Sequence, residues 1–172
     1  MENPSSKNIQ ITSTFVADPI LGPMRFLTEK LGIDADIRFS DFNQVFQQLL
    51  DPTSESSRNR SGFNLFLIRL EDLSEKAITE AIVEELESAF LQFSKAADAR
   101  NLVLFCPKEN REDGVIRLEE MAVEKLGHIP SVTVLASSEL ENLYPVTDPF
   151  DPEAERVGKI PFTETMFAAL AT

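Results

Sequence analysis

The sequence predicts an α/β domain built on a five-stranded parallel sheet, and two observations carry this prediction. Segments with the pattern of a strand alternate with segments of helical periodicity along the whole chain, which is typical of a doubly wound sheet. The stretch Phe63–Leu70 (FNLFLIRL) is almost continuously apolar, as a central strand buried on both faces would be. Right-handed crossovers then favour a three-layer, flavodoxin-like fold with strand order 2-1-3-4-5. In that order, a ligand site is expected beside the carboxyl ends of strands 1 and 3.

The first half of the chain supplies two strands and two helices before the central strand. Ile9–Phe15 alternates apolar and polar residues, and Ala35–Phe39 is a second, shorter strand. Between them, apolar residues recur at helical spacing and Gly32 ends the helix: Ile20, Met24, Leu27 and Leu31. Asp41 is expected to cap a second helix, which Pro52 stops. The apolar residues of that helix form one stripe: Phe42, Val45, Phe46, Leu49 and Leu50.

The second half continues the alternation. Ser74 is expected to cap a long helix whose inward residues are Ile78, Ile82, Leu86, Phe90, Phe93 and Ala97. Leu102–Cys106 and Val132–Leu135 are the fourth and fifth strands, with a helix between them marked by Val115, Leu118, Ala122 and Leu126. A short helix over 137–143 follows. Segment 144–162 is long enough to cross back over the carboxyl edge of the sheet, and Thr163 begins the last helix.

One polar segment lacks any structural period. Residues 51–62 (DPTSESSRNRSG) contain many Ser, Asn and Arg residues and are expected to form a mobile, solvated loop. Because this segment follows a helix, we expect it on the amino-end side of the sheet, away from the cleft. Arg58 and Arg60 are its basic residues, and solvation explains them better than a docking role.

Composition limits the classes of function. A chain of 172 residues is the size of one domain, and the whole of 1–172 is predicted to be a single unit with an ordered core from residue 8. The net charge of −13 argues against partners such as nucleic acid or an anionic membrane. One cysteine and one histidine leave no set of ligands for a zinc site, so no metal or resident cofactor is expected. The N-terminus has no apolar signal segment, which favours a cytoplasmic protein.

Polar residues follow the predicted strands at the edge where a ligand would bind. Ser13, Thr14 and Asp18 come after strand 1, Asn43 and Gln44 after strand 2, and Glu71 and Asp72 after strand 3. These residues are the candidate lining of a binding cleft. A structural role stays open for several of them, because an acidic pair after a strand often caps the next helix and an Asn-Gln pair often bonds to neighbouring turns.

Three familiar uses of such a cleft find little support. A flavin phosphate loop needs glycine after strand 1, and the segment there (TSTFVADP) has none. A phospho-receiver needs an acidic pair at the same place, where this chain has Thr14 and Phe15. A serine hydrolase could use Ser13 or Thr14 as nucleophile and Asn43 as oxyanion donor, but His128, the base it needs, falls at the opposite edge of the sheet. Cys106 ends an apolar strand and is interpreted as a core residue.

Several blocks of the chain resemble a known family. ITSTFVADPI, FNQVFQQLLDP, NLFLIRLEDL, LVLFCPKEN and the C-terminal LENLYPVTDPFDPEAERVGKIPFTETMFAALAT together look like the FkbH-like N-terminal domain. The resemblance implies an SGNH-hydrolase-like fold and a domain excised from a polyketide or nonribosomal peptide synthase. It also implies that Lys159 stands where relatives carry a catalytic histidine. A lysine is normally protonated at neutral pH and cannot accept a proton, so hydrolase chemistry looks lost.

Three functions are consistent with these observations. The first is a non-catalytic or vestigial domain that positions a neighbouring catalytic domain or a carrier protein, whose phosphopantetheine arm would enter the cleft. The second is an acyl- or ester-processing enzyme that uses Ser13 or Thr14 with Lys159 as an unusual base. The third is a docking domain that recruits another polypeptide through its acidic surface.

Overall fold

A computed structural model describes residues 6–172 and contains one five-stranded sheet. The strands are β1 (Lys7–Ser13), β2 (Ala35–Phe39), β3 (Gly62–Ile68), β4 (Arg100–Phe105) and β5 (Val132–Leu135). All neighbouring strands are parallel and their order is β2-β1-β3-β4-β5, which confirms the predicted α/β class, three-layer architecture and topology. Within the described residues, no helix is long and apolar enough to cross a membrane.

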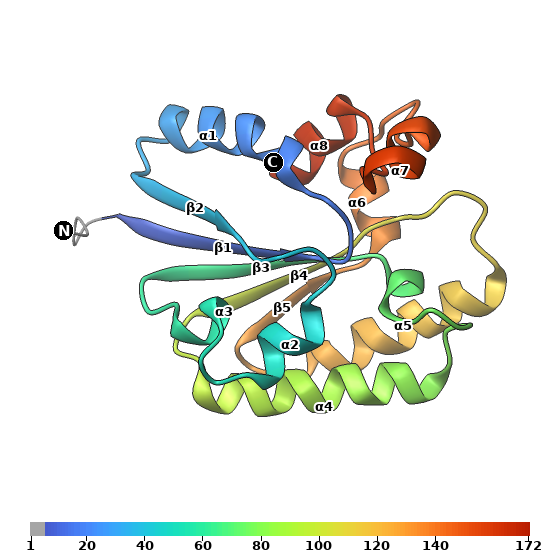
Figure 1. Ribbon diagram of the computed structural model, residues 1–172, viewed down its shortest axis with the longest axis horizontal. Coiled ribbons are helices and arrows are strands. Elements are labelled where there is room, and N and C mark those ends of the chain that lie inside the picture. Colours follow the sequence, from blue (N-terminus) through green and yellow to red (C-terminus); the bar gives the residue numbers. More distant parts are fainter. Residues whose placement is uncertain (1–5) are drawn as a thin grey trace.

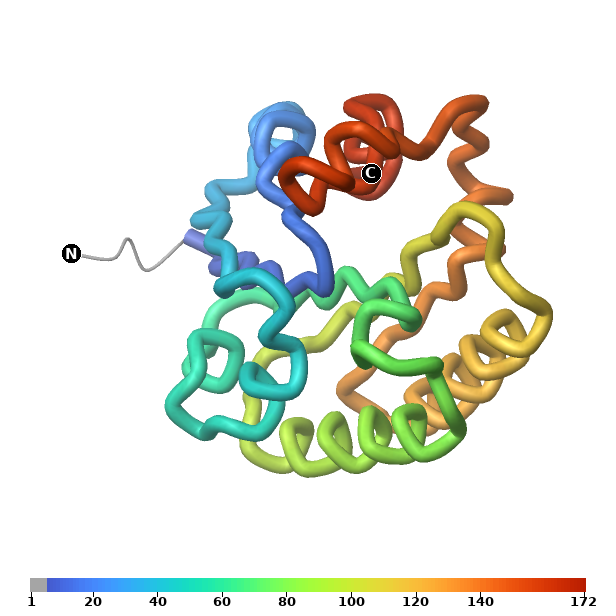
Figure 2. Tube along the Cα trace, turned by 45° about the vertical axis from the view of Figure 1, so that its right-hand side comes forward, coloured from blue at the N-terminus to red at the C-terminus, as the bar shows by residue number. Residues whose placement is uncertain are grey.

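Helices cover both faces of the sheet (Figures 1 and 2). One face carries η1 (Asp18–Ile20), α1 (Leu21–Lys30), α6 (Ser137–Leu143) and α8 (Glu164–Ala171). The other face carries α2 (Val45–Leu50), α3 (Glu55–Arg58), α4 (Glu80–Ala96) and α5 (Asp113–Gly127). The helices cover both faces because alternate residues of the central strands are apolar on each side.

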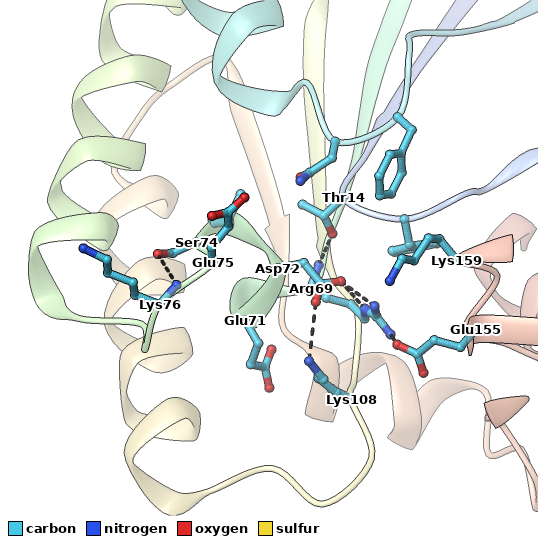
Figure 3. A pocket seen from close by; sticks show the side chains of 14 residues that line it. Thr14, Arg69, Glu71, Asp72, Ser74, Glu75, Lys76, Lys108, Glu155 and Lys159 are labelled. Carbon is cyan, nitrogen blue, oxygen red and sulfur yellow. Dashed lines mark hydrogen bonds and ion pairs between the residues drawn. The ribbon is translucent and has the colours of Figure 1, made fainter. Parts of the chain in front are cut away.

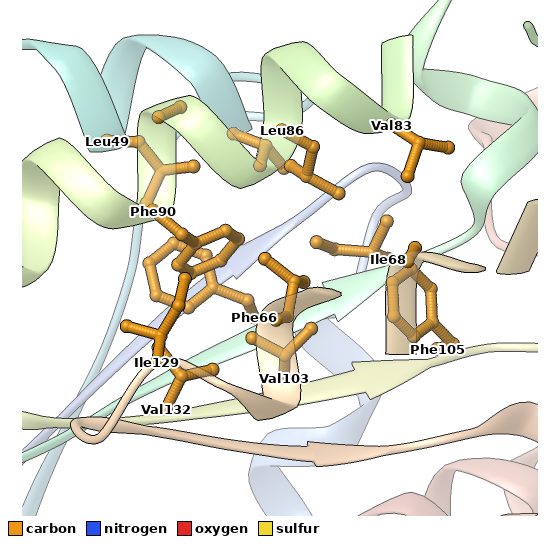
Figure 4. Close-up of a cluster of buried hydrophobic side chains, with 14 of the residues drawn as sticks. Leu49, Phe66, Ile68, Val83, Leu86, Phe90, Val103, Phe105, Ile129 and Val132 are labelled. Carbon is orange, nitrogen blue, oxygen red and sulfur yellow. The ribbon is translucent and has the colours of Figure 1, made fainter. Parts of the chain in front are cut away.

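Each face has its own aromatic core. On the α4 side, Phe66 of β3 makes edge contacts with Phe90 and Phe93, with ring centroids 5.0 and 5.9 Å apart (Figure 4). On the α8 side, Phe162 meets Phe15 at 5.1 Å and Phe167 at 5.8 Å. Fully burying one such side chain contributes about 1.5–3 kcal/mol, so these rings fix the helices that flank the carboxyl edge.

Two helices begin later than the sequence predicts. Helix α2 starts at Val45 and not after Asp41, because Asn43 adopts a left-handed conformation with φ of 56° and interrupts the turn. Helix α4 starts at Glu80, with Thr79 before it, and not at Ser74. The 3-10 turn η2 (Leu70–Leu73) follows β3, and the Ser74 hydroxyl accepts the Lys76 amide in a local turn instead of capping a helix.

The prediction of a mobile loop over 51–62 is wrong. This segment contains α3, and Ser54, Ser56, Ser57 and Asn59 are all buried. The Ser54 hydroxyl caps α3 by accepting the Ser57 amide at 3.1 Å. Polar side chains are buried here because they hydrogen-bond to one another and to polar residues of the strands, so burial leaves them satisfied.

The C-terminal segment crosses back over the carboxyl edge as predicted. It contains α7 (Pro152–Gly158), with Asp151 capping the helix through the Ala154 amide at 2.9 Å. An antiparallel bridge joins Phe150 to Phe162. The Val16 amide donates to the Lys159 carbonyl at 2.9 Å, which ties the end of α7 to the loop that follows β1.

Candidate functional site

An open cleft of about 630 Å³ lies at the carboxyl edge, beside the ends of β1 and β3. These are the strands at which the chain changes direction across the sheet, where doubly wound folds bind ligands. Figure 3 shows that its walls come from loops after four strands and from α7. The lining residues are Thr14, Phe15, Phe42, Asn43, Arg69, Glu71, Asp72, Leu73, Ser74, Glu75, Lys76, Lys108, Glu155 and Lys159.

Arg69 is the central charged residue of this cleft. It directly follows β3, and only 5% of its side chain is exposed. Its guanidinium donates to Asp72 Oδ2 at 2.5 Å and to Glu155 Oε1 at 2.7 Å, and it lies 5.7 Å from the centre of the Phe15 ring. Because Arg69 is paired with two carboxylates of the protein, its charge is not available to a ligand.

A second arginine organises the neighbouring loop after β4. Arg111 Nε donates to Glu71 Oε1 at 3.0 Å, and the other end of the guanidinium pairs with Glu119 at 2.6 Å. The Ser137 hydroxyl also donates to Glu119, at 2.6 Å. Burial disfavours the charged guanidinium, but Glu119 and Glu71 outweigh it and raise the pKa of Arg111. This network joins η2, α5 and α6 into one rigid wall beside the cleft.

The two candidate nucleophiles are both occupied by internal hydrogen bonds. The Ser13 hydroxyl is buried and donates to the Phe15 carbonyl at 2.5 Å. The Thr14 hydroxyl oxygen accepts the Arg69 amide at 2.9 Å, and Thr14 is 2% exposed. Neither hydroxyl bonds to a basic side chain, so neither has the base that would activate it for attack.

The structure brings some of the predicted cleft residues together and leaves others out. Thr14, Asn43, Glu71, Asp72 and Lys159 line the same cleft. The remaining predicted residues, Ser13, Asp18 and Gln44, lie outside its lining. Asp18 begins the η1 turn on one face of the sheet, and Gln44 is the residue before α2.

Asn43 and Gln44 therefore do not form the first turn of a helix that points at the cleft. Asn43 sits in a left-handed turn, and its amide donates to the Ser13 carbonyl at 3.1 Å. Helix α2 is only six residues long and starts one residue beyond Gln44.

His128 and Cys106 take the structural roles that the sequence favours. His128 follows the end of α5, before β5 begins, so it lies at the amino edge of the sheet, opposite the edge that carries the cleft. Cys106 is fully buried, and burial raises the pKa of its thiol. A thiol that stays protonated at neutral pH is a poor nucleophile.

Sequence reasoning missed the residues that give the cleft its charge. Arg69 was missed because it lies in an apolar stretch that was interpreted as a strand. An arginine at the end of a buried strand nevertheless indicates a nearby acidic partner, because buried charges are almost always paired. Glu155 escaped because it lies in a proline-rich segment without an assigned helix. Phe42 was assigned to the buried stripe of a helix, yet it is 47% exposed and lines the cleft.

The acidic residues of the cleft do not suit a magnesium ion. Asp72 accepts Arg69 through one oxygen and lies 3.5 Å from Lys108 through the other, while Glu71 accepts Arg111. Carboxylates that are engaged by cations are not available as ligands, and the position after β1 has Ser13 and Thr14 in place of acids. Over the described chain, no three His, Cys, Asp or Glu residues are grouped so as to hold a metal ion.

Comparison with known proteins supports the fold alone. No protein-family model and no curated protein matches the chain. A solved structure does match: the N-terminal part of the protein BF1531 from Bacteroides fragilis, which contains a phosphatase domain and is complexed with Mg. The match has a TM-score of 0.75 at 11% sequence identity, and it covers 99% of this chain. It covers 51% of the other chain, so this chain spans about half of that structure's length.

These comparisons overturn the assignment to the FkbH-like family. The matched structure contains a phosphatase domain, and no comparison links the chain to a synthase or to SGNH hydrolases. The blocks that suggested the family have local explanations. In FNQVFQQLLDP, for example, Val45 and Leu49 pack into the core, while the Gln48 side chain accepts the Ser56 amide at 3.1 Å. The resemblance therefore reflected the packing of a common fold.

Proposed function

We propose that this chain is a non-catalytic domain that positions a neighbouring catalytic domain, with the carboxyl-edge cleft as part of the contact surface. The observation that carries this proposal is the hydrogen bonding of the two hydroxyls at the end of β1. Ser13 donates to a carbonyl two residues away, and Thr14 accepts the amide of Arg69. A catalytic hydroxyl needs a base and an open approach, and these side chains have neither.

The matched structure suggests what kind of domain the partner is. That structure contains a phosphatase domain and is complexed with Mg, and this chain spans about half of its length. The acids of the cleft here are paired with Arg69, Lys108 and Arg111, which does not suit a metal-dependent phosphatase site. We therefore propose that the partner carries the metal-dependent site and that this domain lies beside it.

The remaining expectations about function stay predictions. They comprise a carrier protein as an alternative partner, a cytoplasmic location, the absence of a resident cofactor, and the absence of nucleic-acid and membrane partners. The acidic surface, with a net charge of −13, is consistent with the last of these.

A labelling experiment tests the non-catalytic part of the proposal. The purified protein is treated with a fluorophosphonate and analysed by intact mass, and it is assayed with p-nitrophenyl acetate and with p-nitrophenyl phosphate plus Mg²⁺. We expect no adduct and no turnover above the buffer rate. An adduct that disappears in Ser13→Ala or Thr14→Val would instead establish the ester-processing alternative, with that hydroxyl as its nucleophile.

A crosslinking experiment tests the positioning part. A photoreactive phenylalanine analogue replaces Phe42 at the cleft, or Leu31 at the far end of α1 as a control, because both side chains are exposed (47% and 71%). The variants are expressed at natural level in the native host. We expect Phe42 crosslinks to peptides of a polypeptide segment with phosphatase activity. Equal crosslinking from both positions, or none from position 42, would contradict a contact at the cleft.

A further inference from the structure

Lys159 has an unusual backbone conformation for its residue type. It ends α7 with φ of 58° and ψ of 31°, in the left-handed region. Glycine is the usual residue at such a helix end, and a lysine there is strained by its Cβ atom. In the described part of the chain, the two other non-glycine residues with positive φ are asparagines, Asn43 and Asn110, a residue type that tolerates this region.

The surrounding structure fixes the backbone of Lys159 in place. Its amide donates to the Glu155 carbonyl at 3.0 Å, and its carbonyl accepts the Val16 amide at 2.9 Å. Figure 3 shows its side chain reaching from the end of α7 into the cleft, towards Arg69. Strained residues persist where surrounding contacts hold them and they cluster at binding sites, and Lys159 lines the cleft.

The ion pairs of the cleft leave Lys159 without a carboxylate partner among the described residues. Arg69 and Lys108 pair with Asp72 and Glu155, and Glu71 pairs with Arg111 outside the lining. Among the described residues, the charged lining residues without an ion pair are Lys76, Lys159 and Glu75. The lining as a whole is neutral, with four cations and four acids, so an anionic ligand would pair with a lysine that has no internal partner.

The cleft also offers hydrogen-bond donors and an apolar surface. The Asn43 side-chain amide has no acceptor among the described residues. Phe42 and Leu73 supply the apolar part, and Phe42 is 47% exposed. An exposed aromatic ring in the same cleft as a cation without an ion pair suits a ligand with an apolar body and a charged end.

We propose that the cleft is a binding site for a small organic anion, whose carboxylate or phosphate pairs with Lys159 and whose apolar body packs on Phe42. This proposal goes beyond the positioning role, since a domain that only positions a partner needs no small ligand. The Lys159 ammonium provides charge-assisted hydrogen bonds, and the donors around it accommodate the remaining anionic oxygens.

The test is an NMR titration of the ¹⁵N-labelled protein with four probes at low ionic strength. Phenyl phosphate and benzoate carry the two anionic groups, benzyl alcohol is the neutral analogue, and inorganic phosphate has no apolar body. We expect shifts at Asn43, Lys159 and Leu73 with phenyl phosphate or benzoate, with Kd on the order of 1 mM for ligands of this size. Whichever of the two binds more tightly identifies the anionic group. The alcohol and inorganic phosphate are expected to bind at least about tenfold more weakly.

The decisive variant is Lys159→Gly, which removes the ammonium and relieves the backbone strain. We expect it to unfold at a higher urea concentration than the parent and to lose at least about tenfold in affinity for the anionic probe. Asn110→Gly is the matched control, because Asn110 also has positive φ (55°) but lies outside the cleft lining. It should keep full affinity.

Three results would overturn the proposal: no shifts up to 20-fold the expected Kd, equal binding of benzyl alcohol, or unchanged affinity in Lys159→Gly. None of these depends on the partner domain, so the crosslinking result at Phe42 stays informative whichever way the titration turns out.

Discussion

Arg69 follows a strand whose last five residues are buried, and its charged side chain is buried as well. Two acids from different parts of the chain, Asp72 in η2 and Glu155 in α7, make the burial tolerable by pairing with it. The cost of desolvating these charges is large, so such a cluster adds more to the specificity of the arrangement than to net stability. Its effect is to fix α7, and with it Lys159, over the cleft.

Substitution of Arg69 by methionine tests this role. The variant leaves Glu155 without its cation and Asp72 with Lys108 alone, and we expect a loss of about 2–4 kcal/mol in the free energy of unfolding, measured by urea denaturation. The estimate is at the lower end of values for buried pairs because Glu155 is 34% exposed. The double variant Arg69→Met/Glu155→Gln should recover part of the loss. A double variant as unstable as the single one would show that Glu155 and Arg69 are not coupled.

At the residue scale, sequence reasoning finds side chains by their place after a strand. That rule located Thr14, Asn43, Glu71 and Asp72, because the end of each strand is visible in the apolar pattern. It could not find the pairing of Arg69 with Glu155, which are 86 residues apart in sequence. Contacts at such separation depend on how the last segment crosses the sheet, and no local pattern encodes that path.

At the scale of elements, strands were easier to predict than the starts of helices. The five strands are short and are marked by apolar runs or by alternation of apolar and polar residues, so their positions follow from the local sequence pattern. The start of a helix depends on capping and on the left-handed residues before it, and these are set by tertiary contacts. Helix α2 begins at Val45 because the Asn43 turn is bonded to the Ser13 carbonyl, a contact that the sequence does not display.

The segment around α3 shows why polar composition misleads. Asn59 is 1% exposed, and its side-chain amide lies within hydrogen-bond distance of the Asn8 and Phe63 carbonyls and of Asn64 Oδ1. Asn64 in turn donates to Asn101 Oδ1 of β4 at 3.0 Å. A sequence rich in Ser and Asn looks solvated until the strands beside it supply matching polar groups. The segment is therefore a packed layer under the amino half of the sheet.

Asn59→Ala tests whether this network orders the segment. The substitution leaves the Phe63 carbonyl and Asn64 without their buried donor, and we expect a loss of about 2–3 kcal/mol in the free energy of unfolding. Arg58→Ala is the neighbouring control, because Arg58 is exposed and should change stability by less than about 0.5 kcal/mol. Urea denaturation measures both. Equal, small effects would mean that the segment is loosely held and that its polar contacts are not formed in solution.

At the scale of the whole molecule, the parallel sheet brings the carboxyl ends of all five strands to one edge, and the strand order opens that edge between β1 and β3. This consequence was accessible from the sequence, since alternation of elements and right-handed crossovers determine it. The sequence predicts that segment 144–162 crosses this edge, but it does not predict that the segment contains the helix α7. The charges that α7 contributes became visible only in the structure.

The net charge of the molecule gives a prediction at this largest scale. With 29 acidic residues against 16 basic ones, the folded protein repels itself, and salt should stabilise it by screening that repulsion. We expect Tm to rise by a few °C, which corresponds to about 1 kcal/mol for a chain of this size, as NaCl increases from 10 to 150 mM. The Debye length falls from about 30 to 8 Å over that range, whereas the buried pairs of Arg69 and Arg111 are screened far less.

The double variant Glu109→Gln/Glu141→Gln is the matched test of this cause. Both side chains are exposed and form no ion pair among the described residues, so the change reduces the net negative charge by two without removing an ion pair. It should raise Tm at 10 mM NaCl and reduce the rise on adding salt, with KCl giving the same result as NaCl. A Tm that falls with salt would mean instead that surface ion pairs, such as Arg60 with Asp98, outweigh the repulsion of the acidic surface.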